Sequence, residues 1–213
     1  MSRKDQAYDY IRENILNNSF APGTPLKEVE LSKELNLSRS PIREALRELE
    51  MNGLVTCYPS YGTFVSVITP YDVEEVSELR SLCELWALEK GFDRLNTKKL
   101  DDLEEGFIAC SSPFVWEQYH ETDRAFHKLI VDSSNSKRLS TFVDSLNDQI
   151  ERVRRYSAKE PDRAKNSIHE HLKIIQCIRE KNLPAAKEAL RVHLEHVSAS
   201  AIEACKMIDS SKL

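Results

Sequence analysis

Apolar residues recur every three or four positions in two early segments of the chain, a spacing that predicts two amphipathic helices. The first segment covers residues 5–17 and ends before the helix breakers Pro22-Gly23-Thr24-Pro25. A short helix is expected next, from about Glu28 to Leu35. Asn36 then suits a tight turn, because asparagine tolerates the left-handed conformation. In the second amphipathic segment the apolar stripe falls at i, i+3, i+4 and i+7: Ile42, Ala45, Leu46 and Leu49.

The next stretch is dominated by β-branched and aromatic residues, which predict a hairpin. Residues 54–58 and 63–68 are rich in Val, Thr, Phe, Tyr and Ile, and they flank the turn sequence Pro59-Ser60-Tyr61-Gly62. Asn52-Gly53 ends the helix that precedes them. The order helix, helix, tight turn, helix, hairpin is that of a winged helix-turn-helix.

From residue 69 onward the pattern is helical, with little strand signal. The expected helices cover residues 70–94, 97–110, 113–132, 136–157, 161–181 and 184–207. Short connections between six helices favour an antiparallel bundle. The predicted fold class is therefore mainly α, with a winged helix-turn-helix in residues 1–68 and an all-α bundle in residues 69–213.

Composition narrows the class of protein further. The 213 residues are 40% hydrophobic and 31% charged, as in ordinary globular proteins. No apolar run approaches the roughly 20 residues of a membrane helix, and the N-terminus lacks the apolar core of a signal peptide. Five cysteines, an odd number without a close pair, predict reduced thiols buried in helices. The net charge is −5, so any nucleic acid must be bound through a local basic cluster.

Such a cluster is present on the helix that follows Asn36. Arg39, Arg43 and Arg47 are spaced by four residues, so they line one side of that helix. In a helix-turn-helix this helix enters the major groove, and the arginine fork grips guanine O6 and N7, or a phosphate, with two hydrogen bonds. The same spacing also fits a solvated face with Arg–Glu pairs. The tight turn before the helix and the hairpin after it favour DNA binding.

The N-terminal residues also resemble a known family. The DNA-binding domain of the GntR family of bacterial transcription regulators is similar to four stretches of this chain: Pro22-Gly23, Leu26-Lys27-Glu28-Val29-Glu30-Leu31, SRSPIREALRELEMNGLV (38–55) and Gly62-Thr63-Phe64-Val65. Together these stretches lie within residues 5–68.

The resemblance implies roles for individual residues. Arg39 and Arg43 would contact DNA directly, Ser40 would belong to the same surface, Arg47 would support them, and the hairpin tip at Gly62 would approach the minor groove. Many relatives carry basic residues just before the wing glycine, where this chain has Ser60-Tyr61. Its wing is therefore expected to attract phosphates less strongly.

The helical region contains a set of residues suited to a metal ion. Asp123 and His127 are four residues apart, which places a carboxylate and an imidazole on one helix face. His171 and His193 lie on two later helices, and a bundle can bring such residues together in its core. A single histidine is more often a core or surface residue, and three further histidines compete for the same role: His120, His169 and His196.

Residues 70–208 resemble the FCD ligand-binding domain, the helical partner of one GntR branch, and the short bundle is similar to its VanR-like subgroup. The family's metal pattern is Asp-x-x-x-His followed by one histidine on each of two later helices. Asp123, His127, His171 and His193 match it. The resemblance thus implies a divalent metal ion, and one carboxylate with three imidazoles suits zinc, nickel, cobalt or manganese better than calcium or copper(I).

Arg80 is a candidate ligand-binding residue, because an arginine among apolar neighbours must meet an anion or solvent. A salt bridge to Glu84, four residues further on, is the alternative interpretation. In the family, an arginine at this place helps to hold the carboxylate of the effector. The same cavity has three further candidate arginines, between which the sequence does not choose: Arg152, Arg154 and Arg155.

These features predict a transcription regulator that is not an enzyme and acts in the bacterial cytosol, at the nucleoid. It would bind operator DNA as a homodimer and act as a repressor that a small organic acid relieves. Two alternatives are a metal-dependent enzyme, in which an open Asp/His₃ site activates water, and a metal sensor without an organic effector. No convincing acid or base stands beside the predicted ligands, which disfavours the enzyme.

Overall fold

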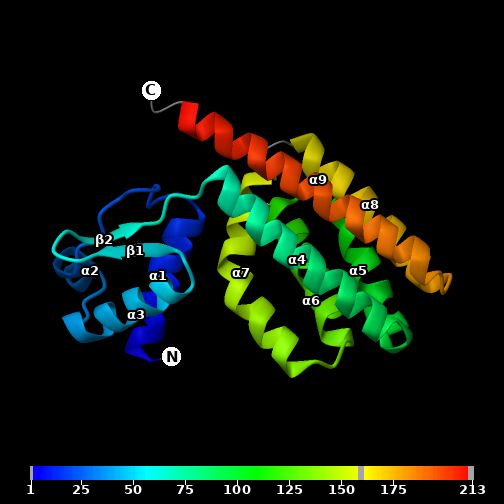
Figure 1. Cartoon of the computed structure of the whole chain (residues 1–213), viewed down its shortest axis with the longest axis horizontal. Helices are drawn as coiled ribbons and strands as arrows, with labels where there is room; N and C mark the ends of the chain where they lie inside the picture. Colours follow the sequence, from blue (N-terminus) through cyan, green and yellow to red (C-terminus); the bar gives the residue numbers. More distant parts are fainter. Residues whose placement is uncertain (1, 158–160, 211–213) are drawn as a thin grey trace. The chain divides into compact units, whose positions relative to one another are not determined.

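The computed structural model describes residues 2–157 and 161–210. The chain forms two compact units, residues 1–69 with 145–152, and residues 70–144 with 153–213 (Figure 1). Each unit has an apolar core of its own. One core draws its buried residues from Ala7 to Val65, and the other from Ala87 to Leu194. Within the described part of the chain, no helix is both long and apolar enough to cross a bilayer.

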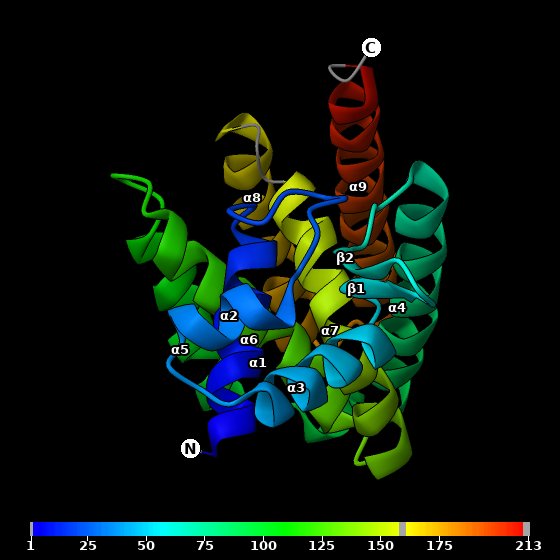
Figure 2. The ribbon, with the colours of Figure 1, turned by 90° about the vertical axis from the view of Figure 1, so that its left-hand side faces the viewer.

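The first unit contains the winged helix-turn-helix. Its elements are α1 (Arg3–Leu16), α2 (Glu28–Glu34), α3 (Arg39–Met51), β1 (Val55–Tyr58) and β2 (Gly62–Val65). Helix α3 packs against α1, α2 and β1 (Figure 2).

Local sequence explains these elements. Ser2 and Asp5 form a reciprocal capping box that starts α1. Asn36 has φ of 51° in the turn between α2 and α3, as its tolerance for this conformation predicts. The strands pair antiparallel, with Val55 opposite Val65, and both of these residues are buried.

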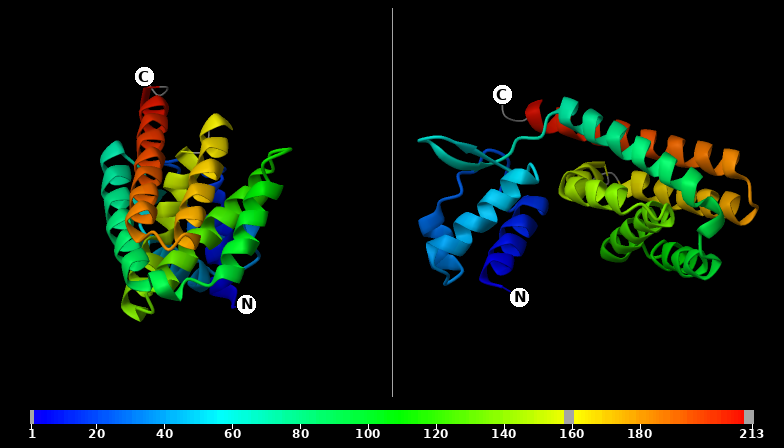
Figure 3. Two further views of the ribbon diagram at one scale, coloured as in Figure 1. Left: turned by 90° about the vertical axis from the view of Figure 1, so that its right-hand side faces the viewer. Right: turned by 60° about the horizontal axis from the view of Figure 1, so that its bottom comes forward.

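The second unit is helical throughout its described residues. Its elements are α4 (Pro70–Gly91), a 3₁₀ turn η1 (Phe92–Arg94), α5 (Thr97–Ala109), α6 (Trp116–Ser133), the two ends of α7 (Lys137–Ser157), α8 (Pro161–Arg179) and α9 (Leu183–Ser210). The middle of α7, residues 145–152, belongs to the first unit. Helix α4 packs against α6 and α9, and α8 packs against α5 and α9 (Figure 3). The predicted fold class, mainly α with a winged helix-turn-helix before a helical bundle, is confirmed.

Glycine permits the close approach of α4 and α6. A Cβ atom at Gly91 would lie 1.9 Å from Ser133 Oγ and 2.4 Å from the Ser133 carbonyl carbon. Any larger residue at this position would therefore force the two helices apart. This packing matters for the site, because α6 carries Asp123 and His127.

Two local predictions are wrong. Helix α6 begins at Trp116 and not at Pro113, because Ser111 and Phe114 pair in a turn around that proline and the Val115 N–H donates to the Cys110 carbonyl. The five cysteines are not all buried in helices, since Cys57 lies exposed on β1.

Candidate DNA-reading helix and candidate metal centre

Helix α3 buries one face and exposes the other. The apolar stripe is 4% exposed or less at every position: Ile42, Ala45, Leu46 and Leu49. Off this stripe, the Arg39 and Arg43 side chains are 60% and 52% exposed, and Arg47 is exposed as well. Guanidinium groups on an exposed helix face can reach base edges or phosphates.

The remaining residues predicted to bind DNA are also at the surface. Ser40 is exposed, and its hydroxyl donates to Glu44 Oε1 at 3.2 Å. Gly62 closes the hairpin turn with φ of 115°, a conformation that favours glycine. Tyr61, just before it, is 84% exposed. The hairpin tip thus presents a tyrosine ring rather than a basic side chain.

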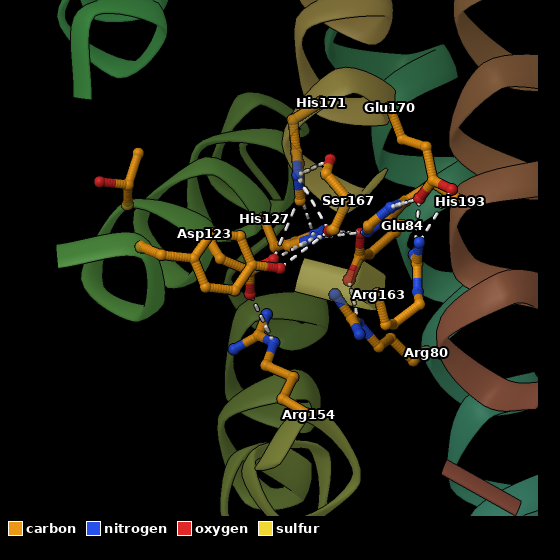
Figure 4. Close-up of polar contacts among 12 residues, drawn as sticks. Arg80, Glu84, Asp123, His127, Arg154, Arg163, Ser167, Glu170, His171 and His193 are labelled. Carbon is orange, nitrogen blue, oxygen red and sulfur yellow. Dashed lines mark hydrogen bonds and ion pairs between the residues drawn. The ribbon is translucent and has the colours of Figure 1, made fainter. Parts of the chain in front are cut away.

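Four buried side chains of the second unit converge on one point (Figure 4). The residues are Asp123 and His127 of α6, His171 of α8 and His193 of α9. Their ligand atoms all lie within 4.8 Å of one another. The Nε2 atom of His127 is 3.2 Å from that of His171 and 3.3 Å from that of His193. Asp123 Oδ1 lies 3.2 Å from His171 Nε2.

Each imidazole is held through its other nitrogen. The Nδ1 atom of His127 lies 2.6 Å from Glu84 Oε2, and that of His193 lies 2.8 Å from Glu170 Oε2. The Nδ1 atom of His171 lies 2.7 Å from the carbonyl oxygen of Ser167. A carbonyl oxygen and ionised carboxylates only accept hydrogen bonds, so each Nδ1 is the donor. A neutral imidazole that donates through Nδ1 carries its lone pair on Nε2, the atom that faces the other candidate ligands.

The carboxylates of the site are ionised. Burial alone would raise the pKa of Asp123, but Arg154, with its Nε 3.0 Å from Asp123 Oδ2, and His127 hold that pKa well below its usual range. Burial would likewise raise the pKa of Glu84. The adjacent Arg80 and His127 reverse this effect and lower it. Both groups are negatively charged at neutral pH.

Two of the imidazoles are neutral at the same pH. Burial is the largest cause that lowers the pKa of His171, and it outweighs the attraction of Asp123. Burial and the neighbouring His171 together lower the pKa of His193 well below its usual range. Neutral imidazole is the form that binds a metal ion.

The three competing histidines lie elsewhere. His169 is exposed, and its Nδ1 contacts the Lys165 carbonyl. His196 is 57% exposed and contacts Glu170 Oε1. His120 lies against Trp116 and lines a pocket beside the four-residue cluster. None of the three belongs to the set that converges.

Arg80 fits both interpretations that the sequence left open. It is 3% exposed, and its Nε donates to Glu84 Oε1 at 2.7 Å. Its Nη2 is buried and has no hydrogen-bond partner among the described residues. Arg80 and Asp123 both line the pocket beside the cluster. A buried guanidinium nitrogen without a partner is costly, so an anion in this pocket would satisfy it.

Sequence reasoning left one arginine of the site undecided and missed another, together with its partner. Of the three arginines left open, Arg154 lines the pocket, and Arg163 of α8 lines it as well. Arg163 donates to both oxygens of Glu170, at 3.0 and 2.6 Å. Arg163 and Glu170 are seven residues apart on one helix, a spacing that places them on the same face. This spacing is the feature of the sequence from which their pairing could have been predicted.

Comparison with known proteins identifies the family. Residues 3–65 match the bacterial regulatory proteins of the gntR family, and residues 75–196 match the FCD domain. The chain belongs to the GntR family. Its helix-turn-helix and FCD domain make it a DNA-binding transcriptional regulator of the GntR/FCD type.

Curated GntR/FCD relatives extend over most of the chain. The chain is 31% identical to the HTH-type transcriptional regulator YdhC of Bacillus subtilis (strain 168) over 195 residues. This alignment covers 90% of this chain and 87% of YdhC. The chain is 28% identical to the HTH-type transcriptional repressor RspR of Escherichia coli (strain K12) over 199 residues. This alignment covers 92% of this chain and 87% of RspR.

Solved structures share the fold. A GntR transcriptional regulator from Rhodococcus sp. RHA1 superposes with a TM-score of 0.78 at 22% identity, covering 95% of this chain and 99% of that chain. A Zn²⁺-bound FCD domain of another transcriptional regulator superposes with a TM-score of 0.58 at 23% identity, covering 64% of this chain and 95% of that domain.

Proposed function

We propose that this GntR regulator is a homodimeric repressor whose operator binding is controlled by a small carboxylate bound beside a divalent metal ion. The observation that supports this most strongly is the convergence of three imidazole Nε2 atoms and one carboxylate oxygen. Because each Nδ1 already donates to an acceptor, neutral imidazoles at these positions would direct their Nε2 lone pairs at one another, and such lone pairs repel. A cation between them removes that repulsion.

The spacing of the ligand atoms also fits a metal ion. Atoms bound about 2.0–2.1 Å from one ion stand roughly 3.0–3.4 Å apart. Two separations fall in this range, 3.2 Å between His127 and His171 and 3.3 Å between His127 and His193. His127 and Asp123 are 3.6 Å apart, and the whole set lies within 4.8 Å. The partners on Nδ1 are of the kind that orients metal-binding histidines. The Zn²⁺-bound FCD domain of similar fold supports the same assignment.

The side chains around the pocket beside the cluster have the chemistry to bind an organic acid, because three arginines line it: Arg80, Arg154 and Arg163. Asp123 faces both the pocket and the cluster, so an acid in the pocket would lie next to the ion. The bound ion would supply an open coordination position for one carboxylate oxygen. Arg80 Nη2 would donate to the carboxylate, a charge-assisted hydrogen bond, while Arg80 Nε stays bonded to Glu84.

On the DNA side, we assign operator contacts to five residues of the first unit: Arg39, Ser40, Arg43, Arg47 and Gly62. A helix-turn-helix reads two half-sites as a dimer. Leu82 and Trp86, one turn apart on α4, are 68% and 45% exposed. This apolar surface is the face on which we place the second copy of the chain. The proposed role as a repressor agrees with the name of the relative RspR, a transcriptional repressor.

The effector assignment is tested by replacing Arg80. Arg80→Ala and Arg80→Lys are expected to retain the metal and to bind small carboxylates about 10- to 100-fold more weakly, since a hydrogen bond to a charged group contributes roughly 1.5–3 kcal/mol. The lysine variant keeps a positive charge beside Glu84, so that carboxylate is not left buried without a partner. Calorimetry with a panel of small carboxylates, on protein of known metal content, measures the loss.

Arg191→Ala is the matched control for Arg80, because within the described part of the chain Arg191 pairs only with exposed glutamates on α9. Undiminished acid binding by Arg80→Lys would refute the role of Arg80. If no acid binds the wild-type protein but metal alone changes operator affinity, the metal-sensor alternative replaces the proposal.

The domain boundary gives a further prediction. We propose that residues 1–68 form the DNA-binding domain and residues 69–213 the effector-binding and dimerisation domain. The isolated 69–213 fragment is expected to be a helical dimer that binds metal and not DNA, because its apolar core lies within residues 85–194, all of them inside the fragment. Circular dichroism and solution scattering check this. An unfolded or monomeric fragment would contradict it.

A further inference from the structure

Two arginines of the proposed DNA-reading surface converge on one carboxylate of the preceding helix. Arg43 donates to Glu28 through Nε at 2.9 Å and through Nη2 at 2.9 Å. Arg39 donates to Glu28 Oε2 through Nη2 at 3.0 Å and through Nε at 3.3 Å. Glu28 is the first residue of α2, whereas both arginines belong to α3. The hydrogen bonds from Arg43, and then those from Arg39, lower the pKa of Glu28 to about 2.

The pairing is selective. The glutamates of α3 itself have other partners, since Glu44 accepts from Ser40 and Glu48 pairs with Lys4. Arg47, the third arginine of the stripe, forms no ion pair or hydrogen bond within the described chain. The Arg–Glu pairing that the sequence allowed within one helix is therefore replaced by pairing between two helices.

The geometry leaves the Nη1 group of each guanidinium, and one hydrogen of Nη2, without a partner among the described residues. A guanidinium has a side edge, formed by Nε and Nη2, and an end edge, formed by Nη1 and Nη2. Glu28 takes the side edge of both Arg39 and Arg43. The end edge can donate two hydrogen bonds, to O6 and N7 of guanine. Because Glu28 already holds the side edge, each long side chain loses less conformational entropy when it binds DNA.

The charge of Glu28 has a second effect. Its side chain is 25% exposed beside two arginines on the surface of α3, so its negative charge opposes that of the nearby DNA phosphates. Phosphate attraction supplies most of the non-specific affinity of a DNA-binding protein. A carboxylate at this place therefore weakens binding to DNA of any sequence. The orientation of the two arginines, in contrast, favours binding to the operator sequence.

We propose that Glu28 is a positioning residue that sets DNA sequence specificity, by holding Arg39 and Arg43 with their end edges presented and by reducing non-specific phosphate binding. The inference rests on the proposed DNA contacts of these two arginines. It adds a residue that touches no base.

The test uses the full chain and two duplexes of equal length. One duplex carries the site that the wild-type protein selects from genomic fragments, and the other has a random sequence. Fluorescence anisotropy at fixed salt gives both dissociation constants for wild type, Glu28→Gln, Glu28→Asp and Glu30→Gln. Glu30 is the matched control, because it is on the same helix and pairs, among the described residues, only with the exposed Lys27. Circular dichroism and thermal unfolding verify that each variant is folded.

Glu28→Gln is expected to bind the random duplex several-fold more tightly than wild type and to lose about tenfold in the ratio of selected to random affinity. Glu28→Asp keeps the charge but is too short to hold both arginines. It should bind the random duplex as wild type does, and the selected site more weakly. Glu30→Gln should leave the ratio unchanged.

An unchanged ratio in both folded Glu28 variants overturns the proposal, and so does an equal loss in Glu30→Gln. A gain for the selected site in Glu28→Gln that matches or exceeds the gain for the random duplex also overturns it, because Glu28 would then only compete with DNA. Arg43→Ala distinguishes a failure of the proposed DNA contact from a failure of the proposed role of Glu28. If it leaves selected-site affinity intact, the DNA contact itself fails. If it weakens that affinity while the Glu28 variants keep the ratio, only the role of Glu28 fails.

Discussion

His127→Ala and His193→Ala are each expected to yield folded protein without bound metal. Each substitution removes one of the four side chains that converge in the second unit. Substituting even an outer partner of a metal ligand weakens affinity by about 10- to 100-fold, so losing a ligand should weaken it by at least that much. Both variants should also lose the response of operator binding to the effector, whatever their basal affinity for DNA.

The variants should fold because the partners of the removed imidazoles keep other contacts. Glu84 retains Arg80 when His127 is absent, and Glu170 retains Arg163 when His193 is absent. Neither carboxylate is left buried without a positive neighbour, the situation that is strongly destabilising. The loss of metal can therefore be separated from a loss of structure.

Two measurements check the metal prediction. Elemental analysis after dialysis gives the metal content, and thermal unfolding with and without added zinc gives the stabilisation that a native-state ligand provides. Zinc should raise the melting temperature of wild type and leave that of the two variants unchanged. His169→Ala is the matched control, because His169 is exposed and lies two residues from His171 on the same helix.

Stoichiometric metal in His127→Ala and His193→Ala would contradict the ligand assignment. The neighbouring histidines would then be the ones to examine: His120, His169 and His196. If only one of the two variants retains the metal, the assignment of that one residue as a ligand is wrong.

Most of the fold was predictable from the sequence because each element carries its own signal. The stripe from Ile42 to Leu49 specifies the buried face of α3 by its period alone, and all four of its residues are buried. Asn36 and Gly53 both adopt positive φ where the sequence indicated a tight turn and a helix end. These signals are local, so they do not depend on how the helices pack.

The contacts of the sites were not predictable in the same way. Spacing places Asp123 and His127 on one face of a helix, but it does not say which other helices that face meets. The Nδ1 partners come from different helices, Glu84 from α4 and Glu170 from α8. Resemblance to a family selected the four predicted ligands, whereas only the packing of α4, α6, α8 and α9 shows what orients them. The pairing of Glu28 with α3 was missed for the same reason.

Arg43→Ala is expected to weaken binding to the operator by about 1–3 kcal/mol, roughly 5- to 150-fold at fixed salt. The Arg43 side chain is 52% exposed and carries its free end edge away from Glu28. Because it lies off the buried stripe of α3, helical content and dimerisation should be unchanged. The loss should be larger for the operator than for a random duplex, since a base contact discriminates between sequences and a phosphate contact does not.

Lys33→Ala is the matched control for this prediction. It removes one positive charge from an exposed position on α2 of the same unit, so it reports the effect of charge alone. Any loss in Lys33→Ala should be similar for the two duplexes, whereas the loss in Arg43→Ala should differ between them. Equal losses in Arg43→Ala would reduce Arg43 to a phosphate contact, and unchanged operator affinity at the same salt would remove it from the DNA-binding surface.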